Sequence, residues 1–115
     1  MAEKIKFRFT LSQNSFKGIA FDEEKDIVVN FSLNIEKGSI DREGKPWSII
    51  ILRTDARVLG VKVYDFFNRI ISKYGEKDHR YPSVHGQTLE CLWRIYDNKL
   101  EKLKEELRKS LNSQT

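Results

Sequence analysis

The last third of the chain, from Ser83 to Leu111, contains no proline and is the stretch that most constrains the fold. Its apolar residues recur at steps of three and four, which is the spacing of one face of an α-helix. The members of this stripe are Leu89, Trp93, Tyr96, Leu100, Leu103 and Leu107. The spacing predicts a single helix with Ser83 as its N-cap, about 43 Å long at a rise of about 1.5 Å per residue.

A helix of this length exceeds the diameter of roughly 30 Å that is expected for the rest of the domain. Its C-terminal part is therefore predicted to project from an α+β domain of residues 1–98 as an extension of residues 99–115, continuous with the helix from about residue 83. The residues expected to join two copies are Leu100, Leu103, Leu107 and Leu111. A narrow leucine stripe favours a homodimer or higher homo-oligomer. The alternative is a single amphipathic helix with a frayed end.

Composition limits the class of protein. The 115 residues suffice for one domain, and 33% of them are charged. No apolar run approaches the roughly 20 residues that cross a membrane, so we expect no membrane partner. One cysteine, Cys91, excludes a disulfide framework and favours a reducing cytoplasm. The formal net charge of +4 permits a nucleic-acid partner without requiring one.

Alternating residues predict strands in the first half of the chain. In Lys4–Leu11 the apolar side chains point one way, and Lys4, Lys6 and Arg8 point the other, about 6.6 Å apart. An edge strand protected by cations is an equally weighted alternative. Ile27–Glu36 alternates between an apolar and a polar face, whereas Trp47–Arg53 is apolar on both.

A second helix is expected after these strands. Its apolar stripe runs from Leu59 to Tyr74, with Thr54 or Asp55 as cap and Gly75 as the C-terminal stop, and residues 76–82 form a polar connection. The predicted fold is α+β: a three- to four-stranded antiparallel sheet packed on one face by this helix and by the long C-terminal helix, with its short zipper-like tail.

If both helices cover one face of the sheet, the other face is basic and partly aromatic. Cations that follow phosphates, together with flat rings on which bases stack, are typical of single-strand binding. The residues expected to bind are Lys4, Lys6, Arg8, Trp47, Arg53, Arg57, Arg80 and Tyr81, with Phe16 or Phe21 as further stacking candidates. A core position for Trp47 and a surface ion pair for Arg53 are the alternatives.

No local signature of catalysis or metal binding is present. The glycines are scattered, and His79 and His85 flank a proline at a spacing that makes no metal site. Cys91 is expected to be a buried structural thiol. We therefore expect a binding protein with no metal and no cofactor. A scaffold that dimerises through the C-terminal helix, or a small enzyme without local signature, stays open.

The order of these segments resembles that of the ThermoDBP-type and ThermoDBP-related single-stranded DNA-binding proteins of thermophilic archaea. The segments that carry the resemblance are Lys4–Leu11, Ile27–Glu36, Trp47–Arg53, the helix ending at Tyr74 and the tail Leu100–Leu107. It implies a small antiparallel sheet packed on helices, a cleft with an apolar floor and basic rim that holds single strands, and a dimerising C-terminal helix. It assigns no binding residue, because the family has no short motif to match here.

Overall fold

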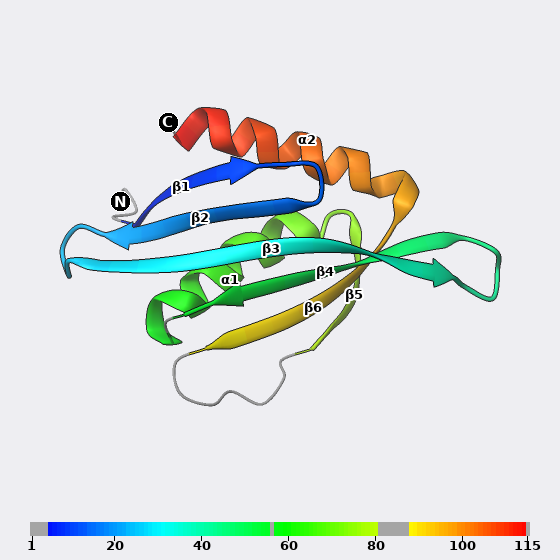
Figure 1. Cartoon of the computed structure of the whole chain (residues 1–115), viewed down its shortest axis with the longest axis horizontal. Coiled ribbons are helices and arrows are strands. Elements are labelled where there is room, and N and C mark those ends of the chain that lie inside the picture. The colour runs from blue at the N-terminus through cyan, green and yellow to red at the C-terminus, as the bar shows by residue number, and fades with distance from the viewer. Residues whose placement is uncertain (1–4, 56, 81–87, 115) are drawn as a thin grey trace.

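The computed structural model describes residues 5–55, 57–80 and 88–114. Six strands and two helices follow one another along this part of the chain (Figure 1). The elements are β1 (Ile5–Leu11), β2 (Ser15–Asp22), β3 (Ile27–Ile40), β4 (Pro46–Thr54), α1 (Arg57–Ile71), β5 (Gly75–Arg80), β6 (Leu89–Tyr96) and α2 (Asp97–Gln114). The predicted α+β class is confirmed.

The strands form one sheet in the order β1-β2-β3-β4-β6-β5, and all neighbouring pairs are antiparallel. Strand β6 lies between β4 and β5, so these two run in the same direction and are joined by α1, as in a split β-α-β unit. The prediction of three or four strands is wrong, because two segments that follow α1 were not recognised as strands.

The first of these segments is β6, which was predicted to be helical. Its residues alternate between buried and half-buried positions. The buried set is Leu89, Cys91, Trp93 and Ile95. The prediction of a helix starting at Ser83 is wrong, since α2 begins only at Asp97 and Ser83 lies outside the described residues. Leu92 and Tyr96 on the opposite face of β6 allowed the same residues to fit a helical period.

The second segment is β5, which was predicted to be a polar connection. Gly75 opens this strand instead of ending α1, so its predicted role as a helix stop is wrong. A Cβ atom at Gly75 would lie 3.0 Å from Ile71 Cγ2 and 3.1 Å from the carbonyl oxygen of Arg94, which explains the glycine by close approach.

The predicted cap residues of α1 bind strand β3. The backbone N–H and the side-chain amide of Asn30 donate to the two carboxylate oxygens of Asp55, each at 3.1 Å. The hydroxyl of Thr54 donates to the carbonyl oxygen of Asn30 at 3.1 Å. These bonds hold the end of β4 to β3 where the chain turns into α1.

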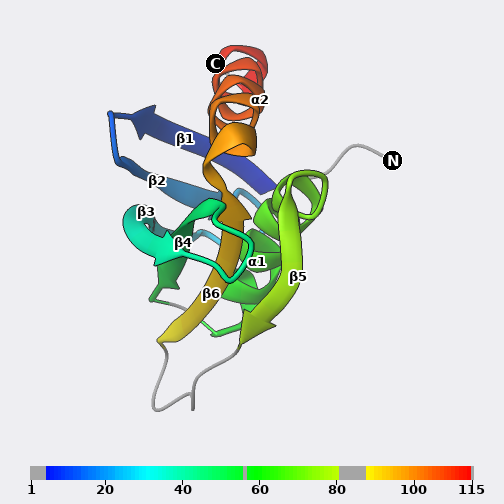
Figure 2. The same ribbon diagram turned by 90° about the vertical axis from the view of Figure 1, so that its right-hand side faces the viewer.

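The core lies between one face of the sheet and the two helices. Figure 2 shows α1 on one side of the twisted sheet and α2 at the end next to β1. Six of the seven phenylalanines meet in this layer, where neighbouring ring centroids are 4.5–6.4 Å apart. They are Phe7, Phe9, Phe16, Phe31, Phe66 and Phe67. Burial of these rings contributes to the stability of the fold.

Helix α2 is part of the same core. Leu103 and Leu107 have no exposed surface and belong to the cluster that contains the phenylalanines, and half-buried Leu100 packs against it. The hydroxyl of Tyr74 donates to Glu106 at 3.2 Å, which links α2 to the turn after α1.

The predicted contact between two copies is therefore corrected. Leu103 and Leu107 face the core of their own chain, so they do not form an exposed leucine stripe. The side chain of Leu111 lies outside the described residues. The division into a domain of residues 1–98 and an extension of residues 99–115 is not supported either, because α2 completes the core. The physical reason for both corrections is that α2 is shorter than the predicted helix and lies along the domain instead of projecting from it.

Gly18 in β2 lies where two strands and a ring come close together. A Cβ atom there would collide with the carbonyl oxygen of Arg8 and would lie 2.8 Å from Phe9 Cβ and 2.9 Å from Phe31 Cζ. Glycine is thus required for packing at this position.

Candidate nucleic-acid interface

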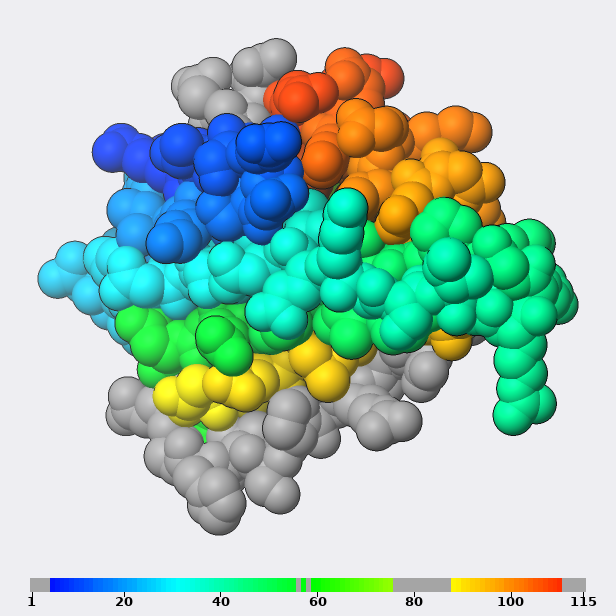
Figure 3. Space-filling model, turned by 45° about the vertical axis from the view of Figure 1, so that its right-hand side comes forward, coloured from blue at the N-terminus to red at the C-terminus, as the bar shows by residue number. Residues whose placement is uncertain are grey.

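Alternate residues of β1, β2, β3, β4 and β6 point away from the core and form a second face, which we call the open face. Its members are Lys6, Arg8, Thr10, Lys17, Ile19, Phe21, Val28, Asn30, Ser32, Asn34, Glu36, Trp47, Ile49, Ile51, Arg53, Glu90, Leu92, Arg94 and Tyr96. Among the described residues no helix lies over this face, where β1 and β2 (blue), β3 (cyan) and β6 (yellow) reach the surface (Figure 3).

Register places polar and cationic residues in rows across the open face. One row runs Thr10, Lys17, Ser32, Arg53 and Glu90 over five neighbouring strands. Neighbouring strands are about 4.8 Å apart, so the backbone positions of Lys17 and Arg53 are roughly 10 Å apart. Lys6 and Arg8 lie on β1 beside this row. The predicted cations Lys6, Arg8 and Arg53 thus share one face.

Two of these cations have carboxylate partners. Lys6 Nζ lies 2.8 Å from Glu23 Oε1, and Arg53 Nε lies 3.2 Å from Glu90 Oε1. All four side chains are between 43% and 59% exposed. The surface ion pair considered for Arg53 is therefore present. Exposed pairs of this kind contribute only about 0–1 kcal/mol, so an incoming phosphate can replace the carboxylate.

Of the remaining predicted cations and the tyrosine, only Arg57 has a described side chain, and it does not join this set. Arg57 is exposed at the start of α1, the helix on the opposite face. Arg80 ends β5, where its backbone pairs with Leu92, and its side chain lies outside the described residues. Lys4 and Tyr81 also lie outside them. Of the expected binding residues Arg57, Arg80 and Tyr81, the described structure thus places only the side chain of Arg57, away from the open face.

Trp47 lies on the open face and is half-buried, so the alternative of a core tryptophan is wrong. Its ring has two neighbours. The Arg94 guanidinium carbon is 4.6 Å from the ring centroid, and Gly38 lies so close that a Cβ atom there would collide with the indole. A cation over an aromatic ring is attracted by its quadrupole. The prediction of Trp47 as a free stacking surface is therefore corrected: a base can reach this ring face only by displacing Arg94.

Arg94 also connects the open face to the turn between β3 and β4. Arg94 Nη2 lies 3.6 Å from Asp41 Oδ2, whose side chain is only 13% exposed. Asp41 accepts hydrogen bonds from the backbone N–H groups of Lys45 and Glu43, each at 2.9 Å. The bond from Lys45 is the largest cause that lowers the pKa of Asp41 below its usual value, and the charge of Arg94 acts in the same direction.

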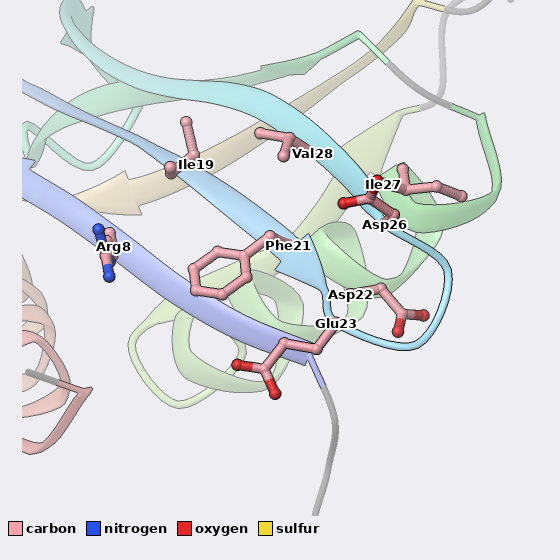
Figure 4. A pocket seen from close by; sticks show the side chains of 8 residues that line it. All are labelled: Arg8, Ile19, Phe21, Asp22, Glu23, Asp26, Ile27 and Val28. Atoms are coloured by element: carbon pink, nitrogen blue, oxygen red, sulfur yellow. The ribbon is translucent and has the colours of Figure 1, made fainter.

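A depression of about 380 Å³ lies at the turn between β2 and β3. Ile19, Phe21 and Val28 form its apolar part, and Asp22, Glu23 and Asp26 project from the turn in different directions (Figure 4). The guanidinium carbon of Arg8 lies 5.5 Å from the centroid of the Phe21 ring. Phe21 is thus the phenylalanine on the open face, whereas Phe16 is completely buried and cannot stack on a base.

The described residues hold no metal-binding group and no activated thiol. No three histidine, cysteine, aspartate or glutamate side chains come together there to hold an ion. Cys91 is 1% exposed, and burial raises the pKa of its thiol to about 12. A thiol with such a pKa is inert at neutral pH, so the prediction of a structural cysteine is confirmed.

Two residues of the open face were missed from the sequence. Lys17 follows the buried Phe16, so strict alternation along β2 would have placed it beside Thr10 and Ser32. Arg94 was assigned to a helix face, and only the register of β6 on β4 brings it next to Trp47.

Comparison with known proteins adds no relative. No family model, no curated protein and no solved structure matches the chain. Neither helix in the described part of the chain combines the length and apolar character needed to cross a membrane.

Proposed function

We propose that the open face binds single-stranded nucleic acid and that the protein acts by binding and not by catalysis. The observation that carries the proposal is the position of the cations. Lys6, Arg8, Lys17 and Arg53 share the face that no described helix covers, beside half-buried Phe21 and Ile51. Single-strand binding needs this combination of backbone charge and apolar contact with exposed bases.

Charge alone does not favour a single strand over a duplex, but the shape of the face does. The cations stand on a sheet, and α2 carries lysines and glutamates mixed along its length. A helix that reads the major groove needs base contacts along one of its faces. Apolar residues such as Phe21 gain from bases only when those bases are unpaired, since paired bases are stacked on each other.

Phosphates and base faces are common to DNA and RNA, so we propose single-stranded DNA as the ligand with RNA bound through the same contacts. Capture starts with phosphates that replace Glu23 and Glu90 as partners of Lys6 and Arg53. Release of counterions from the strand then supplies much of the affinity. Contacts of this kind carry little sequence information.

The face belongs to one chain, so the proposal does not require self-association. A scaffold that dimerises through α2 is less well supported, because Leu103 and Leu107 are already buried. Analytical ultracentrifugation with and without a bound strand measures the oligomeric state independently of binding.

The test is fluorescence anisotropy of a labelled single strand and of the matching duplex at low salt. We expect the single strand to bind more tightly. We expect Lys17→Glu to weaken binding by tenfold or more. The control is Lys102→Glu, which makes the same charge change at an exposed position of α2 and should have a much smaller effect. Equal binding of duplex and single strand, or equal effects of the two substitutions, would contradict the proposal.

A further inference from the structure

A hollow of about 560 Å³ lies on the open face between the β1–β2 turn and the middle of β3 and β4. The lining residues used below are Gln13, Asn14, Asn34, Glu36, Ile51 and Arg53. Three of them carry uncharged amides, and Arg53 is the only cation in the described lining. This lining differs from the open face of β1 and β2, where the cations Lys6, Arg8 and Lys17 stand. The body of the hollow is therefore better suited to a neutral polar group than to a phosphate.

The walls of the hollow are held by hydrogen bonds to the sheet. The backbone N–H of Ile35 donates to the carbonyl oxygen of Asn14 at 2.9 Å, which fixes the turn to β3. The backbone N–H of Ser12 donates to the carbonyl oxygen of Ser15 at 2.8 Å, and the two hydroxyl oxygens are 2.6 Å apart. The wall of the hollow is therefore already ordered in the folded protein, so a ligand does not have to order it on binding.

Register defines where the side chains stand. Asn34 pairs with Ser15 on one side and with Ile51 on the other, so its amide lies in the middle of the row. Half-buried Ile51 offers an apolar surface, and exposed Glu36 is the next open-face residue along β3. Arg53 is two residues further along β4 than Ile51, on the side of the cation row.

These groups match the edge and the face of a nucleobase. Asparagine and glutamine amides pair with adenine, and a carboxylate accepts from the amino group of cytosine. A carboxylate repels the carbonyl oxygens of thymine or uracil, and it repels a phosphate as well. An apolar side chain such as isoleucine accepts the face of an aromatic ring by burial of apolar surface.

We infer that this hollow is a subsite for one unpaired base that carries an exocyclic amino group. The base lies on Ile51, and its edge contacts Asn34 and Glu36. Arg53 binds the phosphate of the same nucleotide. The inference rests on the proposed function and makes it more specific, because it predicts a modest preference for adenine and cytosine over thymine within otherwise general binding.

Homopolymers test the inference. Labelled oligo-dA, oligo-dC and oligo-dT of equal length are titrated with the intact protein and with Glu36→Gln. The intact protein should bind oligo-dA and oligo-dC about tenfold more tightly than oligo-dT, the lower end of the effect of one hydrogen bond to a charged group. Glu36→Gln should bring this ratio close to one, because an amide can donate to the thymine carbonyls.

The ratio of dissociation constants is the readout, since removing any negative charge raises affinity for all strands. Glu101→Gln makes the same charge change at an exposed position of α2 and should leave the ratio unchanged. Equal affinity of the intact protein for the three strands, or an unchanged ratio in Glu36→Gln, would overturn the subsite and leave the proposed function standing. Absence of binding to every strand would overturn both.

Discussion

Arg8 and Lys17 are the cations of the open face for which no carboxylate partner appears within the described residues, so their removal gives the most direct measure of phosphate binding. In single-strand complexes the logarithm of the binding constant falls with the logarithm of salt concentration at a slope of about −0.7 per neutralised phosphate. If Lys6, Arg8, Lys17 and Arg53 each neutralise one phosphate, the expected slope is about −2.8.

The double substitution Arg8→Gln and Lys17→Gln should therefore reduce the slope to about −1.4. Between about 50 mM and about 200 mM salt, the intact protein should lose affinity roughly 50-fold and the double variant roughly 7-fold. Fluorescence anisotropy with one labelled strand over a salt series measures both slopes under identical conditions.

The matched control is Lys62→Gln with Lys102→Gln, which removes the same net charge from exposed positions of α1 and α2. Its slope should stay close to that of the intact protein. If the two double variants have the same slope, the strand is bound by overall charge and not by the open face, and the reasoning from register fails.

The remaining predictions concern the fold. Leu107→Ala should lower the free energy of unfolding by about 2–5 kcal/mol in urea titrations, without changing the molecular mass measured by light scattering, because this side chain is in the core of its own chain. Gly18→Ala should lower it by about 1–3 kcal/mol, seen as a lower melting temperature, since the added Cβ has no room. At pH 8 iodoacetamide should label Cys91 far more slowly in the native protein than in urea, because burial raises its pKa to about 12. The pKa of Asp41 is lowered in the folded state. The ionised carboxylate therefore stabilises the fold above pH 3.8, the usual pKa, and this stabilisation is lost as the pH falls through the lower pKa of the folded state. Asp41→Asn should therefore make the free energy of unfolding less dependent on pH below about pH 4. Urea titrations over this pH range that give the same dependence for the variant and the intact protein would contradict this.

Alternation in the sequence was sufficient to predict β1 and the Ile27–Glu36 part of β3. In β1 and β3, apolar and polar residues alternate with a period of two, and the predicted core faces are those that the helices cover. The open face of β4 was also predicted, since Trp47 and Arg53 have the same parity along the strand. These elements have patterns that only one backbone conformation satisfies.

The two strands that follow α1 were misread because their patterns are ambiguous or weak. Leu89, Trp93 and Tyr96 fit a helical stripe, yet the buried residues of β6 lie at every second position. Strand β5, Gly-Glu-Lys-Asp-His-Arg, has little intrinsic preference for extended structure and is held by pairing with β6. Local sequence therefore could not predict either strand, because each depends on a partner that is distant along the chain or forms later.

The same limit applies to the candidate site. Arg94 lies on Trp47 although 46 residues separate them along the chain. Glu90 on β6 pairs with Arg53 on the neighbouring strand β4. Sequence could indicate that these side chains are basic or aromatic. Only the register of β6 shows that some of them are already engaged with each other.

The position of β6 has a consequence for synthesis on the ribosome. This strand fills the gap between β4 and β5, so the sheet cannot close until about residue 96 has emerged from the exit tunnel. Until then the isoleucines of β4 border an unpaired strand edge, which is a template for association between nascent chains. Closure of the sheet is thus expected to wait for the synthesis of β6, and slow translation between β4 and β6 would lengthen the vulnerable interval.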